Sequence, residues 1–546
     1  MTFDSKRRRA APKGGNRPNS NFGGNRPNTI VGDVRSGKSG GPRFQKNQNP
    51  KPYERPRATR PPGAPVPGPV PGNDEILFIP MGGCSRIGMN MALYGHAGKW
   101  LIVDAGVAFM GDEAPGIDSL MADPSFIEER MDEVVGLVVT HAHEDHIGAI
   151  HHLWPGLECP IYATPFAAHV IRDRLKESGG LRHARIRVFE PGASFEIGPF
   201  GIETITVTHS IPEPVSVAIH TKAGTVLHTG DWKFDPHPLV GPTMDLDALK
   251  RLGDRGVLAM MCDSTNANVD GTTGSEADAR AGLIEAFAGR KGAIAVTGFA
   301  SNVARMQAVA EAAAAHDRKV VLVGRSMLRM EKAARASGYL EKAPEFISIM
   351  EASWTPRRNL VFLCTGSQGE ERAALSRLAR DGHRELWLEG GDTVIFSARA
   401  IPGNEVVLAD VQDHLKAKGV EVVTPADAPV HVSGHPKRDD LIRMYDLIRP
   451  RFSVPVHGTM EHLEAHARLA RACGVERALV PEDGDILRIA REGTAVIGHM
   501  EPKRLANTGR ELIPWAGLPV AEDADALAGT PTAETSLADT LEQMAA

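Results

Sequence analysis

The stretch His141-Ala142-His143-Glu144-Asp145-His146 places three imidazoles and the carboxylate of Asp145 directly after the apolar run 134–139. A short apolar run of this kind predicts a buried strand, and a strand end holds the side chains that follow it on a rigid base. Imidazole nitrogen and carboxylate oxygen are the ligand atoms that zinc takes when thiolates are absent. The stretch therefore predicts a metal-binding loop, and a solvated loop that is merely rich in His is the alternative.

Further candidate ligands follow other short apolar runs, where loops carry function on a scaffold. They are His209 after residues 202–207, Asp231 after residues 224–228, His457 after residues 452–456, and Asp104 after residues 100–103. Each of them, taken singly, is more often a structural residue than a ligand. Their number and their common position at strand ends favour a shared metal centre.

This set of residues resembles the ligand set of the metallo-β-lactamase superfamily. The resemblance implies that His141, His143 and His209 hold one zinc ion, that Asp145, His146 and His457 hold a second, and that Asp231 bridges both. It also implies that Asp104 orients ligand imidazoles from behind. Two such ions lower the pKa of a hydroxide that they share and stabilise the charge that develops at phosphorus. We therefore expect a hydrolase in which Asp145 and Asp231 are catalytic; manganese suits the same ligands as zinc.

A separate domain is expected between the last two ligands. Asp231 and His457 are 226 residues apart, which is far more than a loop needs. Within this insert, residues 292–297 and 319–323 read as strands around a helix at 301–316, which is a βαβ unit. Residues 360–363 and 385–388 read as further strands. The insert is therefore predicted to be a parallel sheet covered by helices.

Three motifs are similar to those of the β-CASP nucleases, whose extra domain is inserted at this place. They are Asp263 in residues 261–266, His435 in residues 431–436, and His457 in residues 455–458. A His at the third motif is typical of the RNA-directed members. Segments 297–302, 365–369 and 401–405 are similar to landmarks of bacterial ribonuclease J. The resemblance covers about residues 74–515 and implies an αββα metallo-β-lactamase sandwich with an inserted parallel-sheet β-CASP domain.

The segment His431-Val432-Ser433-Gly434-His435 is the candidate site for a substrate phosphate. In an extended conformation His431, Ser433 and His435 share one face, and Gly434 lets the backbone approach a ligand closely. The resemblance implies that His435 is the proton donor and that Asp263 supports it from behind. A turn with satisfied histidines and no ligand is the alternative.

The ribonuclease J family gives this arrangement a function. The resemblance implies a two-metal ribonuclease that degrades 5′-monophosphorylated, single-stranded RNA in the 5′-to-3′ direction and also cuts internally. It further implies roles in rRNA maturation and mRNA decay, a homodimer, and other RNA-decay proteins as partners. The alternatives are a DNA-directed β-CASP nuclease and a catalytically silent RNA-binding subunit.

Composition is consistent with a globular enzyme of the cytoplasm. The 546 residues are 42% hydrophobic and leave room for two or three domains. The five cysteines lie far apart without paired spacing, which favours a reducing compartment. No apolar run approaches the ~18–20 residues of a membrane span, and no apolar segment follows the basic N-terminus as in a secretory signal.

The two ends of the chain differ from its centre. Residues 1–72 are rich in Pro, Gly, Asn and Arg and carry 15 Lys and Arg against three Asp and Glu, which leaves a net charge of −18 on the rest of the chain. We expect a disordered basic arm that contacts RNA phosphates or acts only as a solubilising tail. Residues 516–546 are expected to be a short acidic tail with at most one helix at 536–544, in place of the further small domain common in the family. The predicted boundaries are 73–275 and 437–515 for the lactamase domain and 276–436 for the β-CASP domain.

Two other features, a glycine-rich loop and an aromatic turn, each allow more than one interpretation. The glycine-rich loop 82–88 lacks the Lys-Ser/Thr of a phosphate-binding loop, and the family usually has an acidic residue where Ser85 or Arg86 stands. Phe299, Ala300 and Ser301 are candidate RNA contacts, because an aromatic ring can stack on a base. For Phe299 a buried position is the more common alternative.

Overall fold

The computed structural model describes residues 68–110, 114–401 and 403–516. Residues 1–67 of the predicted basic arm and 517–546 of the predicted acidic tail, with its helix at 536–544, lie outside the described residues. Within the described part, the helices are all too short or too polar to cross a bilayer.

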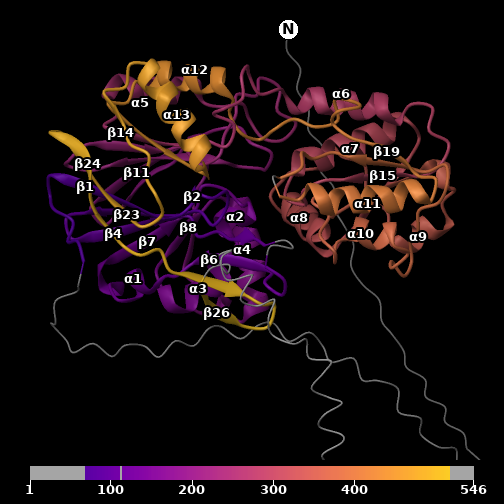
Figure 1. The fold of residues 1–546 in the computed structure, drawn as a ribbon, viewed down its shortest axis with the longest axis horizontal. Helices are drawn as coiled ribbons and strands as arrows, with labels where there is room; N and C mark the ends of the chain where they lie inside the picture. Colours follow the sequence, from indigo (N-terminus) through magenta and orange to yellow (C-terminus); the bar gives the residue numbers. More distant parts are fainter. Residues whose placement is uncertain (1–67, 111–113, 402, 517–546) are drawn as a thin grey trace, which may run out of the picture. The chain divides into compact units, whose positions relative to one another are not determined.

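Two large sheets form the centre of the fold (Figure 1). The first has the order β24 (Gly493–His499), β23 (Asp485–Ala490), β1 (Glu75–Gly82), β3 (Met91–His96), β4 (Lys99–Val103), β7 (Val134–Val138), β8 (Ile161–Ala163), β9 (Ile186–Val188). The second has the order β10 (Ser194–Ile197), β11 (Phe200–Thr206), β12 (Val215–His220), β13 (Thr225–His228), β14 (Ala259–Asp263), β20 (Phe452–Val456), β22 (Arg477–Ala478).

The two sheets pack face to face and are covered by helices on their outer faces. Phe78 and Tyr94 of the first sheet share one buried cluster with Val217 and Val226 of the second. The helices α3 (Ile150–Leu157) and α4 (Pro165–Ser178) pack on the first sheet, and α5 (Leu246–Arg255), α12 (Arg438–Ile448) and α13 (Met460–Ala472) pack on the second. The layers are therefore helix, sheet, sheet, helix, as expected from the resemblance.

The insert is a five-stranded parallel sheet, as predicted. Its order is β16 (Lys319–Val323), β17 (Leu360–Cys364), β15 (Ile294–Thr297), β18 (Thr393–Phe396), β19 (Glu421–Val423). The helices that cover its two faces are α6 (Glu276–Phe287), α7 (Val303–Ala315) and α8 (Arg325–Ala336) on one side and α10 (Ala374–Ala379) and α11 (Glu405–Ala417) on the other.

Short elements complete the chain. The small strands are β2 (Cys84–Ser85) with β21 (Gly458–Thr459), and β5 (Ala108–Phe109), β6 (Ser119–Ala122), β25 (Arg504–Asn507) and β26 (Leu512–Trp515) in a further sheet. The short helices are α1 (Ser125–Glu128), α2 (Glu144–Ile147), α9 (Ile349–Trp354) and the 3-10 turns Met131–Glu133, Gly180–Arg182 and Arg357–Asn359.

The strand predicted at residues 385–388 is wrong. Leu386 and Leu388 are buried and Trp387 is half exposed, so the segment has the alternating pattern of a strand without a strand partner. Side chains accept the hydrogen bonds of its backbone instead. His383 Nδ1 accepts from Leu386 N at 3.2 Å, and Asp392 Oδ2 accepts from Glu389 N at 2.9 Å. The strand that joins the sheet is β18, which begins directly after Asp392.

Helix α7 begins two residues later than the predicted start at Ser301. The side chain of Asn302 accepts a hydrogen bond from Arg305 N at 2.8 Å and is therefore the N-cap. Ser275 and Asp278 form a capping box at the start of α6 in the same way. These caps fix where the helices of the insert begin.

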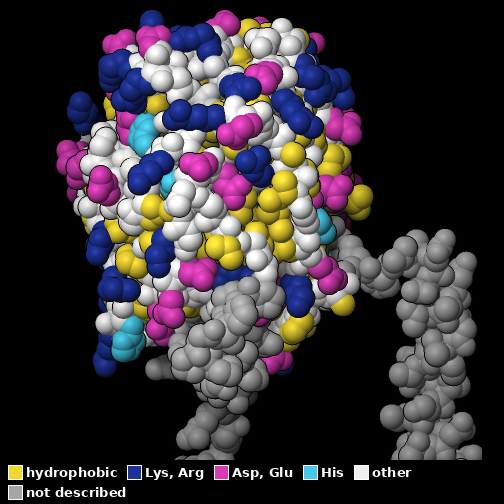
Figure 2. Space-filling model, turned by 90° about the vertical axis from the view of Figure 1, so that its left-hand side faces the viewer, with side chains coloured by type: hydrophobic (Ala, Val, Ile, Leu, Met, Phe, Trp, Pro, Cys, Tyr) yellow, Lys and Arg dark blue, Asp and Glu magenta, His cyan; other side chains and the backbone are white. Residues whose placement is uncertain are grey.

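Charges of both signs cover the described surface. On the face drawn in Figure 2, Lys and Arg side chains are interspersed with Asp and Glu, and small apolar groups lie between them.

Candidate metal centre

The candidate ligands lie where strands of both sheets end. His141 to His146 follow β7 of the first sheet, and Asp104 follows β4. Asp263 ends β14, and His457 follows β20; β13, β14 and β20 are parallel neighbours, so their carboxyl ends meet at one edge. The fold therefore brings together residues that are more than 300 positions apart in the sequence.

One group of ligand atoms, the first set, consists of His141, His143, His209 and Asp231. His143 Nδ1 lies 3.1 Å from His141 Nε2 and 3.0 Å from His209 Nε2. Asp231 Oδ2 lies 3.7 Å from His141 Nε2 and 3.8 Å from His209 Nε2. The four atoms surround one point.

A second group, the second set, consists of Asp145, His146, Asp231 and His457. His146 Nε2 lies 3.3 Å from Asp231 Oδ2 and 3.5 Å from Asp145 Oδ2. His457 Nε2 lies 3.5 Å and 3.8 Å from the same two oxygens. Asp231 Oδ2 therefore belongs to both sets, as the resemblance implied.

The two sets fit a tetrahedral metal ion. With Zn–N and Zn–O bonds of about 2.0–2.2 Å, ligand atoms lie roughly 3.3–3.6 Å apart, close to the distances seen here. Asp231 Oδ1 and His457 Nε2 are buried and have no hydrogen-bond partner among the described residues. Buried polar atoms are rarely left in this state, and a bound cation would satisfy them.

Burial and neighbouring charges set the protonation of the ligands. Burial lowers the pKa of His141, His143 and His209, to about 4 for His143. These imidazoles are therefore neutral, which is the form that binds a metal. Burial alone would raise the pKa of Asp231, but the imidazoles of His457 and His146 lower it well below its usual range. The carboxylate that the two sets share is ionised.

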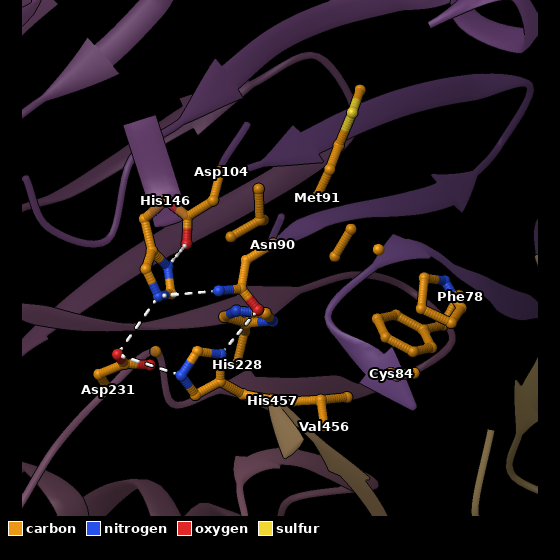
Figure 3. A pocket seen from close by; sticks show the side chains of 15 residues that line it. Phe78, Cys84, Asn90, Met91, Asp104, His146, His228, Asp231, Val456 and His457 are labelled. Atoms are coloured by element: carbon orange, nitrogen blue, oxygen red, sulfur yellow. Dashed lines mark hydrogen bonds and ion pairs between the residues drawn. The ribbon is translucent and has the colours of Figure 1, made fainter. Parts of the chain in front are cut away.

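Asp104 fixes the orientation of the loop behind the ligands. Its Oδ2 accepts a hydrogen bond from His146 Nδ1 at 2.8 Å (Figure 3), which leaves His146 Nε2 to face the second set. The Asp104 carboxylate also accepts two hydrogen bonds from Thr140, one from its backbone N to Oδ1 and one from its hydroxyl to Oδ2, both at 2.8 Å. This arrangement has the geometry of a carboxylate that orients a metal-binding imidazole.

His435 lies beside the metal centre on a support of its own. Its Nδ1 donates to Asp263 Oδ2 at 2.8 Å and lies 3.8 Å from Asp231 Oδ2. Burial alone would lower the pKa of His435, but the carboxylates of Asp263 and Asp231 raise it to about 9. The His435 imidazole therefore carries a proton at neutral pH, which a proton donor requires.

Asn266 holds the rest of the candidate phosphate segment through hydrogen bonds. Asn266 Nδ2 donates to Ser433 Oγ at 2.9 Å and to the carbonyl of His435 at 3.1 Å. Segment 431–435 forms no strand in the structure. Burial and the charge of Arg305 lower the pKa of His431 to about 3, so His431 is neutral and its charged neighbours differ from those of His435.

Gly434 packs against His209, a residue of the first set. A Cβ on Gly434 would lie 2.4 Å from His209 Cε1, and His209 Nδ1 donates to the carbonyl of Gly434 at 2.7 Å. That hydrogen bond leaves His209 Nε2 free for the first set. The segment and the metal centre are therefore built against each other.

Replacing Gly434 with alanine is expected to push the His209 ring out of the first set. Loss of an orienting partner typically weakens metal affinity about 10–100-fold, and equilibrium zinc binding to the purified variant measures this change. Gly298→Ala is the matched control, because a Cβ there meets its nearest atom at 3.6 Å. Unchanged zinc affinity in Gly434→Ala would contradict the account.

The candidate RNA contacts lie elsewhere, in the turn between β15 and α7. Phe299 is 41% exposed, so the expectation of a buried aromatic is wrong for this residue. Ala300 and Ser301 are partly buried in the same turn.

Asn90 is a site residue that the sequence analysis did not identify. It ends the glycine-rich loop, and its side chain lies between His146 and His457 in the pocket that Figure 3 shows. The local sequence carries no signal for this role, because the two imidazoles are 56 and 367 positions away.

Comparison with known proteins agrees with this geometry. Residues 99–249 match the family model of the beta-lactamase superfamily domain, residues 291–415 that of the ribonuclease J beta-CASP domain, and residues 428–481 that of the Zn-dependent metallo-hydrolase RNA specificity domain. The chain is 42% identical to a ribonuclease J of Sinorhizobium meliloti over 80% of this chain and 78% of that protein. It is 43% identical to one of Mycolicibacterium smegmatis over 80% and 79%.

A solved structure supports the fold alone. A protein of unknown function from Enterococcus faecalis aligns with a TM-score of 0.54 at 16% identity, over 76% of this chain and 100% of that one. The relatives and the three matched domains go further, because they concern RNA and metal-dependent hydrolysis. The chain belongs to the ribonuclease J family, the metal-dependent, RNA-directed nucleases that combine a metallo-β-lactamase fold with a β-CASP domain.

Proposed function

We propose that this ribonuclease degrades RNA from a 5′-monophosphate end in the 5′-to-3′ direction, cuts some RNAs internally, and works with two zinc ions. The observation that carries the proposal is the position of Asp231 Oδ2, within 3.3–3.8 Å of ligand atoms of both sets. In this proposal His141, His143 and His209 hold one ion, Asp145, His146 and His457 hold the other, and Asp231 bridges them. Manganese in place of zinc is compatible with the same donors.

The protein's own residues would position the phosphodiester and move the proton. Two bound zinc ions supply the Lewis acidity that activates water and offsets negative charge at phosphorus. The water oxygen forms a bond to phosphorus while the bond from phosphorus to the 3′ oxygen breaks. His435, protonated and held by Asp263, gives its proton to that leaving oxygen. The products are a 3′-hydroxyl on one fragment and a 5′-phosphate on the other.

The preference for a 5′-phosphate is assigned to residues 431–435. The imidazole of His435 lies 3.8 Å from Asp231 Oδ2 and is held by Asp263, and the hydroxyl of Ser433, two residues before it, is held by Asn266. A terminal phosphate bound by such groups would place the first internucleotide bond at the ions, so that one nucleotide leaves per cut. Phe299, with its exposed ring, is the proposed stacking contact for a base.

The wider role is taken from the family. We propose rRNA maturation and mRNA decay as its processes, a homodimer as its assembly, and other RNA-decay proteins as partners. Five unpaired cysteines, four of them buried, support a place in the reducing cytoplasm. The domain boundaries at residues 73, 276, 437 and 516 stay part of the proposal.

Cleavage of one RNA bearing either a 5′-monophosphate or a 5′-triphosphate tests the proposal, with a DNA strand of the same sequence as the control substrate. Mononucleotides are expected mainly from the monophosphorylated RNA, and His435→Ala is expected to lose at least about 10²-fold in rate, the usual contribution of a general acid. Products are resolved to single nucleotides. Internal fragments irrespective of the 5′ end would make the enzyme chiefly an endonuclease, and cleavage of DNA alone would overturn the assignment to RNA.

A further inference from the structure

The side chain of Asn90 connects Asp145 and His457, two residues of the second set. Of the other two members of that set, Asp231 also belongs to the first set and His146 is held by Asp104. Asn90 Oδ1 lies 2.9 Å from His457 Nδ1. Its Nδ2 lies 3.1 Å from the carbonyl oxygen and 3.3 Å from the Oδ2 of Asp145. Figure 3 shows the amide between His146 and His457. No other side chain among the described residues has hydrogen bonds to both Asp145 and His457.

The surroundings fix which way the amide points. The nitrogen faces two oxygens of Asp145 and also Nε2 of His146, at 3.1 Å. The two oxygens of Asp145 are acceptors, so the NH₂ group belongs on this side. The amide oxygen must then face His457 and accept a hydrogen bond from its Nδ1–H.

This hydrogen bond determines which nitrogen of His457 is available for a metal. A neutral imidazole has one N–H and one lone pair, so a proton on Nδ1 leaves the lone pair on Nε2. His457 Nε2 is buried and has no hydrogen-bond partner in the described part of the chain, and it lies 3.5 Å from Asp231 Oδ2. Asn90 therefore holds His457 in the form and direction that a ligand needs.

The backbone of Asn90 makes this support rigid. Asn90 N donates to the carbonyl of Asp145 at 2.9 Å, and Gly106 N donates to the carbonyl of Asn90 at 2.9 Å. A Cβ on Gly106 would lie 1.7 Å from the Asp145 oxygen, so only glycine permits this close packing. The amide is thus fixed to the same loop whose carboxylate it orients.

The first set has other supports. His141 Nδ1 is 3.0 Å from the hydroxyl of Thr140, and His209 Nδ1 donates to the carbonyl of Gly434. Ser210 Oγ lies 3.4 Å from His143 Nε2. Asn90 contacts none of the three imidazoles of the first set through a hydrogen bond in the described structure.

We infer that Asn90 is a positioning residue for the second metal ion, and that removal of its amide weakens the second set while it spares the first. This inference rests on the proposed two-ion function. An orienting partner of this kind typically changes metal affinity about 10–100-fold. Asn90 touches neither the substrate nor the reacting water in this account; it acts through His457 and Asp145.

Zinc binding to the full chain tests the inference. Wild type, Asn90→Leu and Asn90→Ala are dialysed against a series of buffered zinc concentrations, and zinc per chain is measured by mass spectrometry. Leucine has the branched shape of asparagine, with larger terminal groups and without its hydrogen bonds, and alanine removes any crowding that leucine brings. Both variants are expected to bind the first ion as wild type does and the second about 10–100-fold more weakly.

Ser210→Ala is the matched control, because it removes a hydroxyl that faces the first set instead. It is expected to leave the affinity for the second ion unchanged. Equal second-ion affinity in wild type and both Asn90 variants would overturn the inference and leave the two-ion function intact. Equal weakening of both ions would overturn it as well, because the effect would not be selective. A wild type that binds only one ion would instead overturn the proposed function.

Discussion

Replacing Asp231 with alanine is expected to abolish RNA cleavage while most RNA binding remains. Asp231 Oδ2 is the atom that both ligand sets share, so its removal leaves each set with three ligand atoms. Loss of several kcal/mol of charge stabilisation at phosphorus corresponds to a fall in rate of about 10³-fold or more. Single-turnover cleavage of a labelled RNA measures this fall, and fluorescence anisotropy measures binding.

A carboxylate outside the metal centre provides the control for this substitution. Asp173 lies on α4, where its Oδ2 is 3.8 Å from His169 Nε2 on a partly exposed helix face. Asp173→Ala is expected to cleave RNA within a few-fold of wild type, because exposed ion pairs contribute little. Cleavage by Asp231→Ala at a rate near that of wild type would show that the metal centre is not the active site.

Much of this fold could be predicted because the buried strands are short apolar runs with sharp ends. The segments 319–323 and 452–456 coincide with β16 and β20. The order of parallel strands then places the residues that follow them at a common edge. That is why Asp231 and His457 meet, although the sequence alone did not assign them to particular ions and the family resemblance was needed.

What could not be predicted depends on partners that are distant in the sequence. Asn90 is 367 positions from His457, and nothing within the loop 82–90 indicates that its amide faces an imidazole. The conformation of Gly434 was expected to serve a ligand, but its closest neighbour is the ring of His209. Residues 385–388 were predicted to form a strand, and their burial does alternate as in a strand. A strand also needs a neighbouring strand, and here side chains accept the hydrogen bonds of the backbone N–H groups instead.

A buried ion cluster between the lactamase fold and the insert could not be predicted either. Glu276, at the start of α6, lies 2.9 Å from Arg305 Nη2 and 3.4 Å from Lys233 Nζ. Lys233 Nζ also lies 3.3 Å from Asp235 Oδ2. The four side chains are almost fully buried, and their charges balance. A sequence shows four charged residues that are normally exposed and gives no sign that they neutralise one another.

Replacing Glu276 with glutamine is expected to lower the free energy of unfolding by about 3–5 kcal/mol, because the buried Arg305 would then lose its carboxylate partner and Lys233 would keep only Asp235. Urea unfolding at pH 7 measures this loss. The exposed pair between Arg280 Nη1 and Glu311 Oε2, which joins the same two helices at 3.0 Å, provides the control. Glu311→Gln is expected to cost less than about 1 kcal/mol, and an equal cost for the two substitutions would refute the role given to burial.

The pH dependence gives a second test of the same cluster. Burial alone would raise the pKa of Glu276, but the charges of Arg305 and Lys233 outweigh it and lower the pKa from its usual value. A carboxyl whose pKa is lowered by folding adds stability above its unfolded-state pKa, about 4.3 for Glu, and loses that contribution as the pH falls through the folded-state value. The difference in stability between wild type and Glu276→Gln should therefore be largest near neutral pH and shrink below about pH 4. A difference that stays constant over this range would mean that the glutamine costs stability through packing and not through charge.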